Sequence, residues 1–357
     1  MSRFYLVRLT PPNTPATPKT GMQPLTVTIV ESAHEWTTHP SGVYDPAYHN
    51  IQFDFLVVEY ATKPGAMVLT IEGVGMHDLM QAANFSPIMT GTNLFQSWRL
   101  ELYGGMAGDG LPLSTAAAGQ PAPGLLAVGE VQEAFGNWVG TDMSLSFLVV
   151  PEGIQVAPLL FWWTAGQPIA EAIKAMLSQA FPGIPQKRQV SPNIVGPAHG
   201  VTETHETLHG MAHFLKEQTK GTNYGQAANY PGISLYIQNG TLIATDLTQT
   251  DQMTIIELSE ESFIGQPVWT GKDTMSMNLV MRPDIQVGNY VKMPSEFKQL
   301  PGFVNTPAQP TNYDYNFKLL FSGKFKVTAV RHIGESRGQS GEDWMTVVEA
   351  VADPVNG

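Results

Sequence analysis

Apolar and polar residues alternate along most of the chain between Leu25 and Val150, which is the pattern of strands that bury one face. A Lys63-Pro64-Gly65 turn joins residues 51–60 to a strand at 67–71, and this arrangement predicts a hairpin. The other elements predicted in this part are strands at 25–33, 98–105, 125–135 and 143–150, and a short helix at 77–85.

The middle of the chain changes to a helical period. Apolar residues recur every three or four positions over residues 168–180, with Pro168 in the first turn. The same spacing over residues 204–221 predicts a second helix, which Thr204 can cap. The Pro-rich residues 181–200 between the two helices predict an extended linker.

Strands return after the second helix. Asn239-Gly240 lies between two apolar runs and predicts a tight hairpin over residues 233–246. Further strands are predicted at 253–259, 274–281, 287–294, 324–334 and 344–351, and a polar loop joins the last two into a long hairpin.

The order of these elements predicts a mainly β fold with minor α content. We divide the chain into a β-rich part at residues 1–155, a helical α+β connecting part at 156–250 and a second β-rich part at 251–357. The length of 357 residues agrees with two or three domains.

Composition narrows the classes of function. The net charge is -12 and disfavours specific binding of nucleic acid, while charged residues make up only 14% of the chain. A surface with so little charge is often covered by a partner. The absence of cysteine excludes disulfides, thiolate zinc sites and cysteine nucleophiles. No apolar run is long enough to span a membrane, and no export signal is recognisable at the start of the chain.

The motif with the most chemical content is HETLH at residues 205–209. On a helix, His205 and His209 share a face and can hold one zinc ion, and Glu206 can act as a general base toward a bound water. The extended zinc motif would place a third histidine at position 215, which is leucine. His213 lies about 12 Å along the axis from His205, too far for a shared ion.

We therefore favour a packing role for this helix, with its histidines on the polar side, and predict no catalytic, cofactor-binding or metal-binding residue. A zinc-dependent peptidase that uses HETLH remains an alternative.

Three other features could have a function. Trp162 and Trp163 could form a platform for sugars, although within an apolar run they are more typical of a core or a subunit interface. The Gly/Ala/Pro-rich segment 104–124 predicts an exposed loop without regular structure and lacks the strand-to-helix context of a phosphate-binding loop. Residues 259–263 predict a solvated turn, because a calcium loop needs more spaced oxygens.

Three segments of the second half carry a resemblance to a known family. They are IGQPVWTG at 264–271, MRPDIQVGNYVKMP at 281–294 and the final hairpin GKFKVTAVRHIGESRGQSGEDWMTVVEAV at 323–351. Together with the preceding helices and the hairpin at 233–246, they resemble the baseplate hub proteins of contractile-tailed bacteriophages. The resemblance covers residues 160–352. The related core of type VI secretion spikes is a neighbouring possibility.

The resemblance implies two β-barrel domains of the tail-tube type that flank a small α/β middle region. It implies a non-enzymatic homotrimer that joins the sixfold tail tube to the threefold central spike. The partners would be other copies of the chain, the tail tube protein or a tube initiator, the spike protein and the tape-measure protein, with no membrane and no specific nucleic acid. The location would be the baseplate of the virion, after assembly in the host cytoplasm. A carbohydrate-binding β protein is a further alternative.

Overall fold

The fold is mainly β with minor α content, as predicted. The computed structural model describes residues 2–12, 33–58, 67–89, 95–107, 124–151, 155, 157–221, 223–226, 230–246, 254–271, 274–294, 303–304 and 324–352. The strand predicted at 25–33 and the turn at 63–65 lie almost entirely outside these residues. No helix in them is long and apolar enough to cross a membrane.

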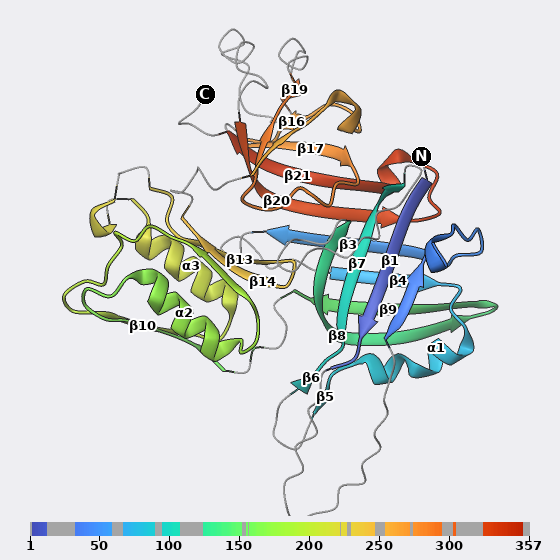
Figure 1. The fold of residues 1–357 in the computed structure, drawn as a ribbon, viewed down its shortest axis with the longest axis horizontal. Coiled ribbons are helices and arrows are strands. Elements are labelled where there is room, and N and C mark those ends of the chain that lie inside the picture. Colours follow the sequence, from blue (N-terminus) through green and yellow to red (C-terminus); the bar gives the residue numbers. More distant parts are fainter. Residues whose placement is uncertain are drawn as a thin grey trace, which may run out of the picture.

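One large sheet contains strands from both ends of the sequence (Figure 1). Its strands from the first part are β1 (Ser2–Thr10), β2 (His34–Thr37), β3 (Asn50–Val58), β4 (Met67–Glu72), β7 (Arg99–Ala107), β8 (Leu125–Val139) and β9 (Asp142–Val150). Those from the last part are β15 (Ile255–Glu257), β16 (Val268–Trp269), β17 (Thr274–Val280), β18 (Tyr290–Lys292), β19 (Phe303–Val304), β20 (Lys324–Glu335) and β21 (Trp344–Ala352).

Among the described strands, the main path of this sheet is open. It runs β19-β16-β17-β21-β20-β3-β4-β9-β8-β7-β1-β2, with β15 and β18 beside it, so β19 and β2 are its end strands. No closed barrel is found among the described strands. The two β-rich parts instead share one hydrogen-bonded sheet, in which β20 pairs antiparallel with β3 from Ala329↔Val58 to Glu335↔Gln52. The domain boundaries at 155 and 250 stay a prediction.

The seam between β3 and β20 is closely packed. Gly334 lies opposite Phe53, and a Cβ atom on this glycine would meet the Phe53 ring at 2.2 Å and the Trp344 ring at 2.8 Å. Phe53 and Trp344 meet edge to face with their centroids 5.1 Å apart. On the outer face of the seam, Arg331 pairs with Asp54. The glycine therefore provides the room in which aromatic rings from both parts of the chain pack together.

The middle part forms two small sheets that two helices cover (Figure 1). β10 (Leu159–Trp163) pairs with β12 (Val201–His205), and β11 (Gln186–Gln189) and β13 (Ser234–Gln238) flank β14 (Thr241–Thr245). The helices are α2 (Ile169–Ala180) and α3 (Leu208–Thr219). Outside this part lie α1 (Met76–Gln81), followed by a 3-10 turn to Phe85, and the short pair β5 (Ile88–Met89) and β6 (Phe95–Gln96).

Several sequence-based predictions are confirmed. β3 and β4 form the predicted hairpin, and α2 buries the predicted apolar stripe. The Asn239-Gly240 turn joins β13 to β14 with a positive φ at both residues, 51° and 69°. That is the backbone of a type I′ turn, which favours this dipeptide.

Two predictions are wrong because strands are longer or more numerous than the sequence indicated. Residues 181–200 are not only a linker, since Gln186–Gln189 pair in parallel with β14. The predicted loop at 104–124 begins too early, since β7 continues to Ala107 opposite Ser2. A Cβ atom at Gly104 would meet Leu126 at 2.7 Å, so this glycine permits close packing inside a strand instead of ending it. The rest of that segment, 108–123, lies outside the described residues.

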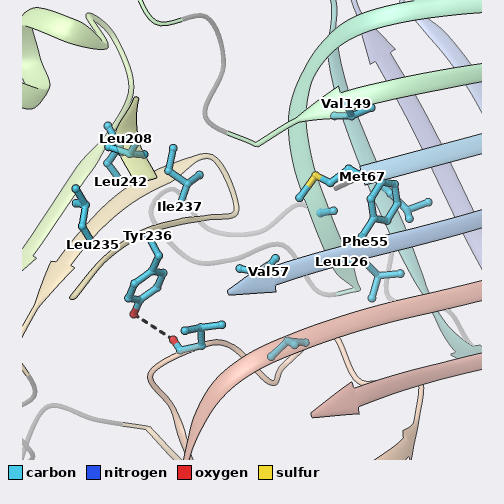
Figure 2. Packing of buried hydrophobic residues seen from close by; sticks show 14 of the residues in the cluster. Phe55, Val57, Met67, Leu126, Val149, Leu208, Leu235, Tyr236, Ile237 and Leu242 are labelled. Atoms are coloured by element: carbon cyan, nitrogen blue, oxygen red, sulfur yellow. Dashed lines mark hydrogen bonds between the residues drawn. The ribbon is translucent and has the colours of Figure 1, made fainter. Parts of the chain in front are cut away.

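The hydrophobic core is continuous across the parts. In Figure 2, Tyr236 and Ile237 of β13 lie on the side of the middle part that faces the end of β3, where Val57 lies. The Tyr236 hydroxyl donates to the carbonyl oxygen of Val287 at 3.2 Å. The small middle part therefore packs against the large sheet through buried side chains.

Candidate functional site

The HETLH residues do not lie on one helix. His205 is the last residue of β12, where it pairs with Leu159, and α3 begins only at Leu208. The Thr207 hydroxyl caps this helix by accepting from the Gly210 N–H at 3.2 Å. The prediction of a helix that starts at Thr204 is wrong, because residues 201–205 pair with β10 and leave capping to Thr207.

The surroundings of His205 are those of a packed side chain. Its ring lies against Phe214, with centroids 5.7 Å apart, and its Nε2 is 3.6 Å from Glu203 Oε1. A Cβ atom on Gly210 would meet His205 Nδ1 at 2.9 Å, so the glycine leaves room for the ring beneath the first turn of α3. Within the described residues, no three His, Asp or Glu side chains are close enough to hold a metal ion. The shared helix face that the zinc hypothesis required is not formed.

Trp162 and Trp163 point to opposite faces of β10. Trp163 is buried and donates from Nε1 to the Gln167 carbonyl at 2.8 Å, whereas Trp162 is 66% exposed. Leu160 lies on the same face as Trp162 and is 38% exposed. The register places Thr204 beside Leu160 and Thr202 beside Trp162, so this outer face carries two apolar side chains and two hydroxyls. We call it the β10–β12 face.

The segment 259–263 forms the predicted turn. Glu260–Ser262 make one 3-10 turn, and Ser262 is buried where Arg282 Nη1 donates to its hydroxyl at 3.2 Å. The turn is thereby attached to the segment that follows β17.

A projecting hairpin is a feature that the sequence interpretation missed. β8 and β9 continue to pair up to Val139↔Asp142, although β7 accompanies β8 only to Glu130 and β4 accompanies β9 only from Ser144. On this extension Phe135, Trp138 and Val139 are 51%, 60% and 65% exposed. We call residues 135–143 the hairpin arm. The alternating pattern predicted the strands but gave no signal for where their neighbours end.

A shallow groove crosses the seam between the two β-rich parts. It is lined by Gln52, Phe53, Asp54, Val68, Thr70, Ile333, Gly334, Glu335, Glu342 and Asp343. Two of its four carboxylates already have partners in the protein: Asp54 pairs with Arg331, and Asp343 accepts from the Ser340 N–H at 2.7 Å. The groove therefore offers an acidic surface, part of which is used to hold the loop between β20 and β21.

Taken together, the described residues offer surfaces for association. These surfaces are the end strands of an open sheet, the hairpin arm and the β10–β12 face. Exposed aromatic side chains of this kind are typical of interfaces, where they contribute much of the binding free energy.

No protein-family model matches the chain, and no curated protein matches it in sequence. Two solved structures are similar over nearly its whole length. The tail protein from Neisseria meningitidis MC58 aligns over 99% of this chain and 98% of its own, with 10% identity and a TM-score of 0.46. The 43 kDa tail protein of prophage MuSo2 from Shewanella oneidensis aligns over 97% of both chains, with 9% identity and a TM-score of 0.48. Because both TM-scores are below 0.5, this similarity does not assign the chain to a family.

Proposed function

We propose that the chain is a structural component of a phage tail, a baseplate hub whose copies form a threefold ring between the sixfold tail tube and the threefold spike. It acts without chemistry of its own, in the virion, after assembly in the host cytoplasm. Its partners are other copies of itself, the tail tube protein or a tube initiator, the spike and the tape-measure protein.

The observation that carries this proposal is the open sheet. Strands from the first and the last part of the chain join edge to edge at β3 and β20, and among the described strands the path ends at β2 and β19. Unpaired strand edges are templates for pairing with another chain. A protein that functions alone usually protects such edges, whereas a ring component uses them.

Two further observations support the same function. The charged fraction of 14% leaves a surface with few groups that must stay hydrated, as in proteins that are covered by partners. The second half resembles phage hub proteins in the three segments given above. In the structure these segments contain β16, β18, β20 and nearly all of β21, which all belong to the large sheet.

The test is assembly with tail components. The purified chain, mixed with the tail tube and spike proteins of the same genome, is expected to form a ring visible by electron microscopy and to contribute about three times 38.9 kDa to its mass. Deletion of its coding sequence is expected to give particles without assembled tails. Normal tails after deletion, or a mixture in which every component stays separate, would contradict the proposal.

A further inference from the structure

The hairpin arm presents an apolar tip that the described part of the chain leaves uncovered. Gly136 packs closely against α1, where a Cβ atom would meet Leu79 Cδ1 at 2.6 Å, so one side of the arm is supported. Trp138 and Val139 are exposed beyond this support, Phe135 is exposed beside it, and Met80 on α1 is 76% exposed. The Trp138 Nε1 donates to the Gly140 carbonyl at 2.8 Å, which holds the indole across the tip of the arm.

The β10–β12 face is a second exposed apolar surface of the described residues, and it lies at the opposite end of the molecule. Figure 1 shows β10 at one end of the long axis and the turn between β8 and β9 at the other. Trp162 and Leu160 project from this face beside Thr202 and Thr204. One chain therefore cannot bring its own arm onto its own β10–β12 face.

The charges of the two surfaces decide which pairing is favourable. Asp142 and Glu133 are exposed on and beside the arm, and the sequence contains no lysine or arginine between Arg99 and Lys174. A tip-to-tip contact would bring carboxylates together with no cation from either arm to balance them. The β10–β12 face carries no charged side chain, and the hydroxyls of Thr202 and Thr204 can donate hydrogen bonds to carboxylates.

The part of the chain that carries the arm is also more acidic than the part that carries the β10–β12 face. Residues 1–155 contain 13 acidic and 5 basic side chains, whereas residues 156–250 contain 5 of each. The first part of one copy is therefore repelled less by the neutral middle part of another copy than by the acidic first part of that copy.

We infer that the hairpin arm of one copy binds the β10–β12 face of the next copy, with Trp138 packed against Trp162. Because the two surfaces lie at opposite ends, the contact is heterologous and joins copies head to tail, which closes into a ring if the rotation permits. The inference rests on the proposed ring function and names its seam. It concerns side-chain packing and is separate from any pairing of the end strands β2 and β19.

The absence of native cysteine permits a direct test. Thr141→Cys places one thiol on the arm and Thr202→Cys places one on the β10–β12 face, both at exposed positions. When the two variants carry tags of different mass and are mixed and oxidised, the mixed disulfide is expected to exceed either self-disulfide at least tenfold. The matched control replaces Thr141→Cys by Val43→Cys, a thiol on an exposed loop that belongs to neither surface, and is expected to give no such excess.

A second measurement distinguishes a failure of the inferred contact from a failure of the proposed ring function. Trp138→Asp and Trp162→Asp are each expected to abolish self-association, and Val43→Asp is expected to leave it intact, with circular dichroism as the check on folding. Rings that survive both tryptophan substitutions would overturn the seam while leaving the ring function standing. A dominant Thr141→Cys self-disulfide, or no mixed disulfide at all, would overturn it as well. A glycan bound by the native chain and lost in Trp162→Ala, without cross-linking, would assign the face to sugars instead.

Discussion

At the scale of single residues, His332 gives a pH dependence with a definite sign. It lies on β20, fully buried, with Nδ1 3.0 Å from the Thr346 hydroxyl, and burial lowers its pKa from 6.5 to about 4. Between these values the unfolded chain binds a proton that the folded chain does not. Stability is therefore greatest above pH 6.5 and falls as the pH drops toward 4, by about 3 kcal/mol across the window.

Chemical denaturation at a series of pH values measures this loss. His332→Gln is expected to lower stability at pH 7 but to flatten the slope between pH 6.5 and 4. His199→Gln, at an exposed position, is expected to keep the native slope. An unchanged slope in the His332 variant would assign the acid sensitivity to other groups.

At the scale of elements, the start of α3 is decided by one hydroxyl. Thr207 accepts from the Gly210 N–H, whereas Thr204 lies on the outer face of β12 opposite Leu160. Thr207→Ala is expected to destabilise the protein by about 1 kcal/mol, because a helix N–H loses its acceptor. Thr204→Ala is the matched control three residues away, and thermal unfolding is expected to show a smaller change. Equal losses would contradict the observed helix start.

The same element shows what the sequence could and could not predict. The apolar spacing of Leu208, Met211, Ala212 and Leu215 was sufficient to predict a buried helix face, and all four are buried. Two threonines could each cap the helix, and local pattern does not choose between them. The choice depends on the pairing of β12 with β10, in which Thr204 lies opposite Leu160, 44 positions earlier, and no local pattern contains this contact. For this reason the single helix that the HETLH hypothesis assumed is not formed.

The exposed tryptophans Trp162 and Trp138 differ in how much the sequence indicated about them. Adjacent residues in a strand face opposite ways, so one of Trp162 and Trp163 points outward from β10, a strand that the sequence analysis did not predict. The exposure of Trp138 followed from no such rule, because it depends on β4 and β7 ending before the hairpin does. Of the two surfaces that we infer to bind each other, the sequence therefore singled out only the tryptophans at 162 and 163.

At the scale of the whole molecule, the seam between β3 and β20 determines whether the two β-rich parts unfold together. Gly334→Ala would drive a methyl group into the Phe53 and Trp344 rings, and overpacking of this kind costs about 1–3 kcal/mol. Gly341→Ala lies in the loop at the end of the same hairpin, where a Cβ atom meets nothing within 4 Å, and is expected to be neutral.

The number of unfolding transitions tells more about the coupling of the two β-rich parts than the loss of stability in Gly334→Ala does. If the shared sheet couples both parts, Gly334→Ala shifts one transition to lower denaturant and leaves it single, because a weakened seam still unfolds with the strands on both sides. If the parts were independent barrels, the same substitution would split the curve in two or destabilise only one part. Tryptophan fluorescence follows Trp36 and Trp98 of the first part and Trp269 and Trp344 of the last, so coincident midpoints by fluorescence and circular dichroism indicate one cooperative unit. In the ring that we propose, such coupling would be favourable, since a subunit whose halves separate easily would break at its own seam before its contacts with neighbouring copies.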